Sequence, residues 1–294
     1  MLYDLVALGE TMLALAPPPG EIVRRTGHLL VDHAGAESNT CVGLARLGLR
    51  VAWVSRLGAD AAGDRIHDAL TDERIDTRWV GRDATRPTGL MIKEPGAGVR
   101  YYRTGSAASA MGPDVLDGVP LGDARAVLVT GVTALIGPEP RAAALTLLGS
   151  ARGLRIVDPN LRAGLWGSDR RVELVLPLIE RCDLLLSGNA ELAEFLGDGD
   201  IHALARRAAA RGPKEVVVRG PSSVGVLTAE GWEELEIRRD AAVDPIGAGD
   251  AFNAGYIAVR LRGGTIGDAL RAGARCGAAV TSTPSDTAGF PRQL

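Results

Sequence analysis

The sequence predicts an α/β fold with a mostly parallel central sheet, helices on both faces of that sheet, and a small β-sheet lid. From Gly112 onward, short β-rich runs alternate with amphipathic helical stretches, a rhythm typical of parallel strands joined by helices. Near the C-terminus, a glycine turn at 247–249 leads directly into an Ala-rich stretch. Two β-rich stretches, at about 11–34 and 86–108, depart from this rhythm. We expect one domain over residues 1–294, with both stretches inserted in the α/β core as lid segments.

The composition is that of an ordinary globular protein. Its 294 residues are 46% hydrophobic and 23% charged, which allows a well-buried core. A net charge of −3 gives no electrostatic reason to expect nucleic acid or an anionic membrane as a partner. The N-terminus does not resemble a signal peptide and no apolar run has membrane-spanning length, so we expect a cytoplasmic protein. The three cysteines are far apart, and each is expected to be a small buried side chain.

The elements of the first half are defined by short apolar runs and by the residues that interrupt them. In order, we expect a strand at 4–8, short strand pieces within 11–33, a helix at 36–47, a strand at 51–54, a helix at 61–73, and strands at 89–92 and 99–103. The run 17–20, Pro-Pro-Pro-Gly, suits hairpins better than a core layer. Gly48 stops the first helix, whose expected buried face is Cys41, Leu44, Ala45 and Leu47.

The second half is expected to supply most of the parallel sheet. Strands are predicted at 126–130, 155–158, 184–187 and 215–219, and helices at 139–151, 169–181, 190–196 and 201–211. A late hairpin at 224–227 and 233–237 precedes the glycine turn, and two helices close the chain. Ligands of open α/β sheets bind at the C-terminal ends of the strands, so we expect the lid to cover those ends.

The glycine turn is the strongest chemical signal. Glycines let backbone N–H groups approach an anion, and the helix that follows points its positive end at the same place. Asp250 stands next to that point, where a carboxylate can take a proton from an attacking hydroxyl. These features predict phosphoryl transfer. Two alternatives stay open: Asp250 merely complementing the helix dipole, and a dinucleotide-binding turn, which would require Gly or Ala where Asn253 stands.

Other ways of stabilising phosphate charge have little support. The only lysines are Lys93 and Lys214, and neither lies in a lysine-bearing phosphate loop or in the protein-kinase context. The four histidines lack zinc-ligand spacing, and no G-x-S-x-G motif suggests a serine hydrolase. Glycine amides, arginine and a metal ion would therefore have to stabilise the transferred group.

Two ordered motifs resemble the signatures of the ribokinase-like (phosphofructokinase B) carbohydrate kinases. Residues 35–48 resemble the N-terminal signature, and residues 244–252 the C-terminal one, about 200 positions later. Essentially the whole chain aligns in order. Within that family the chain is most similar to the 2-keto-3-deoxygluconate kinases, on the basis of Gly35 to Asn39, the run 101–107 and the segment 158–166. Ribokinases usually carry Lys, and fructokinases Pro, near the place that Glu37 occupies.

The resemblance implies a role for each matching residue. Asp250 would be the base that deprotonates the C6 hydroxyl, and the amides of Gly247, Ala248 and Gly249 would hold the charge on the transferred group. Substrate contacts would come from Gly35, Asn39, Tyr101, Arg103, Arg162, Asp250 and Asp286. Cofactor contacts would come from Asn160, Arg162, Ser187, Arg219, Gly220, Gly225, Gly247 and Gly249.

The proposed substrate suits the arginines independently. 2-Keto-3-deoxygluconate bears a carboxylate, and Arg binds planar carboxylates in a bidentate manner. Arg103 lies in the lid run, and Arg162 follows a strand end. The alternative is that both arginines pair or pack at the surface, as most of the arginines in this chain would.

The implied cofactors are ATP and Mg²⁺, with K⁺ as a further candidate. Magnesium would bridge ATP oxygens, mostly through water. The family's N-x-x-E motif is present as 188–191, with Gly188 where Asn is usual and Glu191 in its expected place. Asp244 matches a position tied to a monovalent cation in some relatives, although an ordinary turn aspartate is an equal alternative. The nucleotide-side loop, normally G-x-x-G, runs here from Gly220 to Gly225 with Pro221 inside it.

The expected partners are a small sugar acid and ATP. Exposed edges of a lid sheet would also favour a homo-oligomer, a dimer or higher. Alternatives for the function are a fructokinase or ribokinase-type kinase of another small sugar, a catalytically silent sugar- or nucleotide-binding relative, and a dinucleotide-dependent oxidoreductase. The sequence leaves open the exact sugar, the nucleotide preference and the dependence on a monovalent cation.

Overall fold

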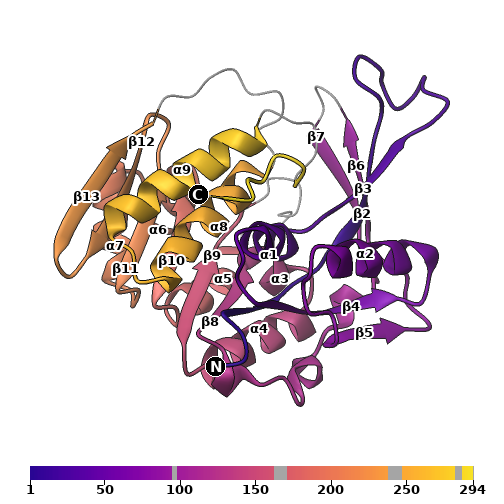
Figure 1. Cartoon of the computed structure of the whole chain (residues 1–294), viewed down its shortest axis with the longest axis horizontal. Helices are drawn as coiled ribbons and strands as arrows, with labels where there is room; N and C mark the ends of the chain where they lie inside the picture. Colours follow the sequence, from indigo (N-terminus) through magenta and orange to yellow (C-terminus); the bar gives the residue numbers. More distant parts are fainter. Residues whose placement is uncertain (95–97, 162–170, 238–246, 282–286, 294) are drawn as a thin grey trace.

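A single large sheet runs through the molecule and a smaller sheet stands apart from it (Figure 1). The computed structural model describes residues 1–94, 98–161, 171–237, 247–281 and 287–293. Among these residues, nine strands form the large sheet in the order β13-β12-β11-β10-β9-β8-β1-β4-β5. The strands are β1 (Leu5–Leu8), β4 (Val51–Gly58), β5 (Val80–Asp83), β8 (Ala126–Thr130), β9 (Leu154–Asp158), β10 (Leu184–Gly188), β11 (Glu215–Arg219), β12 (Ser223–Thr228) and β13 (Gly231–Glu236). Pairing is parallel from β11 to β5, and β12 and β13 join the β11 edge in antiparallel fashion.

Helices cover both faces of this sheet, as the sequence predicted. They are α1 (Ala36–Arg46), α2 (Ala61–Asp72), α3 (Gly131–Leu135), α4 (Pro138–Ser150), α5 (Arg171–Ile179), α6 (Asn189–Leu196), α7 (Ile201–Ala209), α8 (Ala248–Leu261) and α9 (Ile266–Val280). The apolar side chains of α1, α2, α8 and α9 form one buried cluster, and those of α3 to α7 form the other. In β1, Leu5 and Ala7 contact the first cluster, whereas Val6 and Leu8 contact the second. Such burial on both sides explains why the parallel strands read as continuous apolar runs.

The small sheet is the predicted lid. It contains β2 (Met12–Ala16), β3 (Leu30–Ala34), β6 (Leu90–Glu94) and β7 (Gly98–Tyr102), in the order β3-β2-β6-β7. The two hairpins are antiparallel, and β2 pairs with β6 in parallel. Figure 1 shows the four strands together, standing out from the end of the α/β core. The predicted fold class, an α/β core with a small β lid, is confirmed.

Several elements differ from their predicted bounds, for physical reasons. Strand β4 was predicted to end at Val54, but it continues because Ser55 is buried and donates a hydrogen bond to the carbonyl of Gly9 at 2.7 Å. Arg56 likewise donates to the carbonyl of Ala110. A polar side chain that finds a partner inside the fold does not end a strand. Strand β5 was not predicted because it lies at the edge of the sheet and its residues, Val-Gly-Arg-Asp, form no apolar run. Helix α3 was not predicted because five residues are too few to leave a helical period.

Helix α1 is more deeply buried than its pattern indicated. Cys41, Leu44 and Leu47 are buried as expected, but Ala45 is only partly buried. The polar residues of its first half are buried as well, namely Glu37, Ser38, Asn39 and Thr40. Polar side chains buried at a helix start require hydrogen-bond partners within the fold.

The start of helix α5, predicted at residue 169, lies outside the described residues. No helix in the described ranges has the length and apolarity needed to cross a membrane. The assignment of residues 1–294 to one domain stays a prediction.

Candidate active site

The site is built around Asp250, in the first turn of α8. Gly247 precedes that helix with a φ of 84°, in the left-handed region that glycine adopts without strain. The first-turn amides, which include those of Gly247, Ala248 and Gly249, have no acceptor within the helix and form its positive end. Asp250 is 1% exposed, so it lies inside the protein beside those amides.

Two amide side chains hold the Asp250 carboxylate. Asn39 Nδ2, from α1, donates to Oδ2 at 2.9 Å, and Asn160 Nδ2, from the segment after β9, donates to Oδ1 at 3.3 Å. Three segments far apart in the sequence therefore meet at one carboxylate. Hydrogen bonds to both oxygens fix the plane of the group. The arrangement suits a proton acceptor with a set orientation.

A second buried carboxylate lies next to the first. Asp158 Oδ1 accepts from the backbone N–H of Asn160 at 2.8 Å, and Oδ2 accepts from Asn253 Nδ2 at 2.6 Å. Arg219 Nη2 donates to the same Oδ2 at 3.2 Å, and Arg219 Nη1 donates to Asn253 Oδ1 at 2.5 Å. A Cβ placed on Gly249 would lie 3.7 Å from Arg219 Nη2. The guanidinium therefore lies beside the first turn of α8, where it adds positive charge at that helix end.

The lid supplies the next group of side chains. Arg103 follows β7, with its guanidinium carbon 4.9 Å from the ring centre of Tyr101 and its Nε 3.0 Å from Glu10 Oε2. The Nε–H and Nη2–H groups point at Met12 Sδ, so the contact with Glu10 balances charge without forming a well-aligned hydrogen bond. Arg103 Nη1 is buried and has no hydrogen-bond partner among the described residues. It is a donor available to a ligand beneath the lid.

Glu10, just after β1, links the lid to the core. It is 2% exposed, and its Oε1 accepts from Ser106 Oγ at 2.9 Å. Burial raises the pKa of Glu10, while Arg103 and Ser106 oppose that rise. Gly35, the N-cap of α1, lies against the same segment, because a Cβ on it would lie 2.3 Å from the carbonyl oxygen of Glu10. This contact accounts for glycine at position 35.

The Glu37 carboxylate accepts its hydrogen bonds from groups inside the protein and not from solvent. Its side chain is fully buried, and Oε1 accepts from the backbone N–H and hydroxyl of Thr130 and from the hydroxyl of Thr133, at 2.7–2.9 Å. Burial raises the pKa of Glu37, and the bonds from Thr133 and Thr130 oppose that rise. Glu37 thus ties the start of α1 to the end of β8, and thereby supports the neighbouring Asn39.

The residues predicted for metal and phosphate contacts have structural partners. Glu191 Oε2 accepts from the backbone N–H of Gly188 at 2.7 Å and from Ser187 Oγ at 3.2 Å, and Oε1 accepts from the N–H of Leu161 at 3.0 Å. Arg219 Nη2 lies 3.9 Å from Glu191 Oε2. Glu191 therefore joins the ends of β9 and β10 at the border of the Asp158 network. No group of three or more potential ligands, among His, Cys, Asp and Glu, could hold a metal ion within the described residues.

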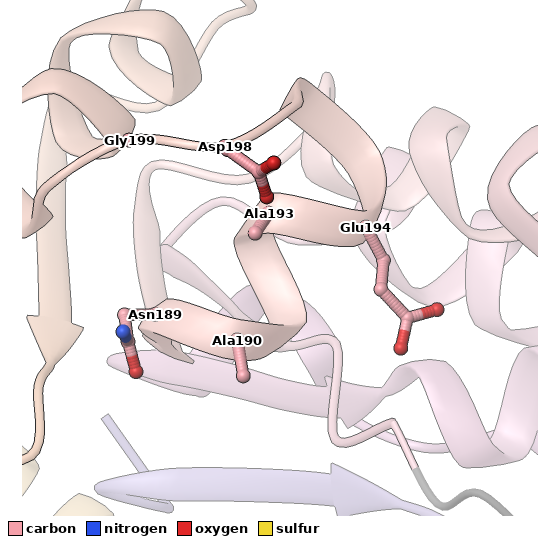
Figure 2. A pocket seen from close by; sticks show the side chains of 6 residues that line it. All are labelled: Asn189, Ala190, Ala193, Glu194, Asp198 and Gly199. Atoms are coloured by element: carbon pink, nitrogen blue, oxygen red, sulfur yellow. The ribbon is translucent and has the colours of Figure 1, made fainter.

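A separate pocket of about 550 Å³ opens along α6. It is lined by Asn189, Ala190, Ala193, Glu194, Asp198 and Gly199 (Figure 2). Asn189 follows Gly188, which stands where the family usually has Asn, and its side chain lines this pocket. None of the residues around Asp250 contributes to the lining.

The two loop glycines predicted for nucleotide contact differ in their surroundings. Gly225 lies within β12, and a Cβ there would lie 2.0 Å from the indole of Trp232, so packing alone requires glycine. Gly220 N donates to the carbonyl of Ser223 at 2.8 Å, which closes the turn before β12. The structure therefore does not bring Gly225 to the Asp250 cluster. Three further predicted residues lie outside the described ranges: Arg162, Asp244 and Asp286.

Sequence reasoning missed several members of the site. Glu10 and Ser106 were not singled out, and Asn253 was considered only as a departure from a glycine motif. Their partners are 34 to 96 positions away, so no local pattern could reveal them. The available signal was polar: a carboxylate directly after the first apolar strand, and an amide one turn beyond Asp250.

An α/β core of this topology with a separate lid sheet is the ribokinase-like architecture, found among kinases of small molecules. A family model described as pfkB family carbohydrate kinase matches residues 3–293. The chain belongs to this family, and it is an ATP-dependent sugar kinase.

Relatives of this chain carry different substrate names. A 2-dehydro-3-deoxygluconokinase from Bacillus subtilis is 31% identical over 99% of this chain and 93% of the relative. A 2-dehydro-3-deoxygalactonokinase from Haloferax volcanii is 30% identical over 98% and 94%. A fructokinase from Klebsiella pneumoniae is 29% identical over 85% and 82%.

Solved structures give the same result for the fold. A PfkB protein from Polaromonas sp. JS666 has a TM-score of 0.88 at 33% identity, covering 98% of this chain and 97% of that one. The 2-dehydro-3-deoxygluconokinase of Thermotoga maritima has a TM-score of 0.83 at 26% identity, covering 96% and 94%. A double mutant of the Vibrio cholerae O395 fructokinase, solved with fructose, ADP and potassium ion, has a TM-score of 0.87 at 23% identity, covering 98% and 96%. This last likeness shows the fold alone.

Proposed function

We propose that the protein transfers the γ-phosphate of ATP to the C6 hydroxyl of 2-keto-3-deoxygluconate, which is the 2-dehydro-3-deoxygluconate of the relatives' names. The observation that carries this proposal is the buried Asp250 carboxylate, held by Asn39 and Asn160 at the positive end of α8. The product would be 2-keto-3-deoxy-6-phosphogluconate. Two relatives, at 31% and 30% identity, are named for the same substrate, and a third, at 30% identity, is named for the galactonate epimer.

The chemistry follows from the placement of these groups. Asp250 accepts the hydroxyl proton as the sugar oxygen bonds to phosphorus and the bond from phosphorus to the ADP oxygen breaks. The amides at the start of α8, with Arg219 beside them, stabilise the negative charge spread over the transferred oxygens. Because these amides and Arg219 stabilise the phosphate charge, a chain with two lysines can act as a kinase without a phosphate-binding lysine.

The preference for an acid rests on Arg103. Its Nη1 is a buried donor without a partner among the described residues, and leaving it so costs free energy unless a ligand accepts the bond. A substrate carboxylate is a planar acceptor of the right charge. Tyr101 stacks against the guanidinium and limits its movement. We assign Gly35 and Tyr101 to the wall of the sugar site and Arg103 to the carboxylate.

Magnesium would be held mainly by ATP oxygens and water. The described residues form no cluster of protein ligands, and Glu191 already accepts three hydrogen bonds. Bound in this way, the metal would supply positive charge near the phosphates. The proposals for Arg162, Asp286 and Asp244, including a potassium site at Asp244, rest on the sequence alone.

The direct test of this function is ADP release measured in parallel with four sugars. We expect the highest kcat/KM with 2-keto-3-deoxygluconate or its galactonate epimer, and at least tenfold lower values with fructose and ribose, as charge-assisted hydrogen bonding to one carboxylate supplies roughly 1.5–3 kcal/mol. A preference for fructose would support the fructokinase alternative. ATP binding with no ADP release in the presence of any of the four sugars would support a binding protein that lacks catalytic activity.

The lid also suggests how subunits associate, and we propose a homodimer through it. Large exposed apolar side chains lie on the two edge strands of the lid sheet, Leu30 and Val31 on β3 and Tyr102 on β7. Val31→Glu should shift the sedimentation coefficient from dimer to monomer. Leu2→Glu, an equally exposed apolar residue outside the lid, should leave it unchanged. A monomeric wild type would contradict the proposal.

A further inference from the structure

Four buried polar residues form a chain of hydrogen bonds that begins and ends on α8. Asn160 Nδ2 donates to Asp250 Oδ1 at 3.3 Å, and the Asn160 backbone N–H donates to Asp158 Oδ1 at 2.8 Å. Asp158 Oδ2 accepts from Asn253 Nδ2 at 2.6 Å. Asn253 and Asp250 are three residues apart on α8, so they lie on the same face of that helix. The chain of hydrogen bonds therefore closes into a ring through the helix backbone.

Every member of the ring is removed from solvent. The exposed fractions are 0% for Asp158, 1% for Asp250, 2% for Asn253 and 5% for Asn160. The backbone of Asn160 has a φ of 44°, in the left-handed region that residues other than glycine seldom adopt. Its backbone N–H thereby reaches Asp158 while its side chain reaches Asp250. This strain and this polar burial both cost free energy, and sites of function are where such costs are retained.

The ring has its own counter-charge. Arg219 donates to both Asp158 Oδ2 and Asn253 Oδ1, so its positive charge balances the charge of Asp158. The side-chain amide of Asn253 therefore has only one orientation that satisfies both Arg219 and Asp158. Asp250 is thus held through Asn160 and through the rotation of α8, both of which depend on Asp158.

We infer that Asp158 and Asn253 are positioning residues that set the orientation of the Asp250 carboxylate by fixing the rotation of α8 against the end of β9. The inference rests on the proposed function, since it assigns the two residues to the action of Asp250. Neither residue touches the reacting atoms in this account.

A purely structural role predicts a different outcome, because α8 has other anchors. Its far end is held by Tyr256, whose hydroxyl donates to Glu215 Oε1 at 2.6 Å, and by Arg260, which bonds both oxygens of Glu215. Buried apolar residues of α8, among them Ala251, Phe252 and Ile257, pack in the core. Loss of one polar contact near Asp250 should therefore shift the carboxylate without unfolding the helix.

The test exchanges the two residues. In Asp158→Asn, whichever way the new amide turns, an N–H replaces an oxygen that now accepts from Asn160 or from Asn253. In Asn253→Asp, two carboxylates face each other at the 2.6 Å contact. In the double variant, Asn at position 158 can donate to Asp at position 253 and still accept from the Asn160 N–H. Arg219 Nη1 can then pair with the relocated carboxylate, so the net charge, the bond from Asn160 and the bond between positions 158 and 253 are restored, whereas the bond from Arg219 Nη2 to position 158 is lost.

We expect each single variant to lower kcat by about 10- to 100-fold, the scale of loss for a reacting group misplaced by about 1 Å, with KM for both substrates nearly unchanged. The double variant should recover most of that kcat. Tyr256→Phe is the matched control, because it should lower Tm through the far end of α8 and leave kcat unchanged.

Single variants with wild-type kcat would overturn the inference while leaving the proposed function intact. So would a double variant whose loss is the product of the single losses. A fall in kcat in Tyr256→Phe at an equal loss of Tm would show that stability alone explains the effect, and would also overturn it. If the wild type transfers phosphate to no sugar, the proposed function fails first and the inference with it.

Discussion

Replacement of Asp250 by Asn is expected to lower kcat for the sugar acid by roughly 10²- to 10⁴-fold, the usual contribution of a positioned general base. Asn has nearly the same shape as Asp but cannot accept the hydroxyl proton. It would also turn one N–H toward Asn39 or Asn160, each of which now donates to an oxygen of Asp250. Steady-state ADP release over a range of sugar concentrations gives the measurement.

The control for Asp250→Asn separates chemistry from folding. Its affinity for ATP should remain close to that of the wild type, because the amides of Gly247 to Gly249 stay in place. Its Tm should fall by only a few degrees, because the substitution removes no apolar contact and disturbs a single buried hydrogen bond, which costs roughly 1–3 kcal/mol. Turnover equal to the wild type would show that another group accepts the proton, and the assignment of Asp250 would be wrong.

Replacement of Arg103 by Lys is expected to lower kcat/KM for 2-keto-3-deoxygluconate by about 10- to 100-fold, which corresponds to loss of a charge-assisted hydrogen bond of roughly 1.5–3 kcal/mol. Lysine keeps a positive charge opposite Glu10, so the buried carboxylate is not left without a counter-ion. It lacks the planar fork that binds a carboxylate through two N–H groups. The same variant should change kcat/KM for fructose by much less.

A double variant checks that the loss belongs to the ligand contact. Glu10→Gln together with Arg103→Met removes both charges of the buried pair, and Gln can still accept from Ser106. We expect this variant to remain folded, to lose the preference for the acid and to keep its weaker activity on fructose. Equal losses on the acid and on fructose would indicate that Arg103 supports the lid and does not bind a carboxylate.

Most of the core could be predicted from sequence because short apolar runs alternate with longer amphipathic stretches. The alternation after Gly112 defined four parallel strands and their helices. Strand β5 was missed because its residues, Val-Gly-Arg-Asp, form no apolar run, and helix α3 because five residues are too few to show a helical period. The end of β4 was missed because Ser55 and Arg56 find polar partners inside the fold, which a hydrophobicity pattern cannot show.

The site was predictable only where a local motif reports chemistry. Gly247 to Asp250 combines a turn, a helix start and a carboxylate, and all three features are visible in four consecutive residues. The hydrogen bonds from Asn39 and Asn160 to Asp250 span 211 and 90 positions in the sequence and depend on the order of the strands in the sheet. Glu10 was not predicted for the same reason, because its partners Arg103 and Ser106 are distant in the sequence and contact it only in the folded protein.

The most direct measurement is a crystal structure of the protein with 2-keto-3-deoxygluconate and an unreactive ATP analogue. We predict the C6 hydroxyl within hydrogen-bond distance, about 3 Å, of an Asp250 oxygen. The same complex should place the sugar carboxylate against Arg103 and the γ-phosphate group over the first turn of α8. A C6 hydroxyl pointing away from Asp250, or a phosphate group bound at another helix end, would contradict the account.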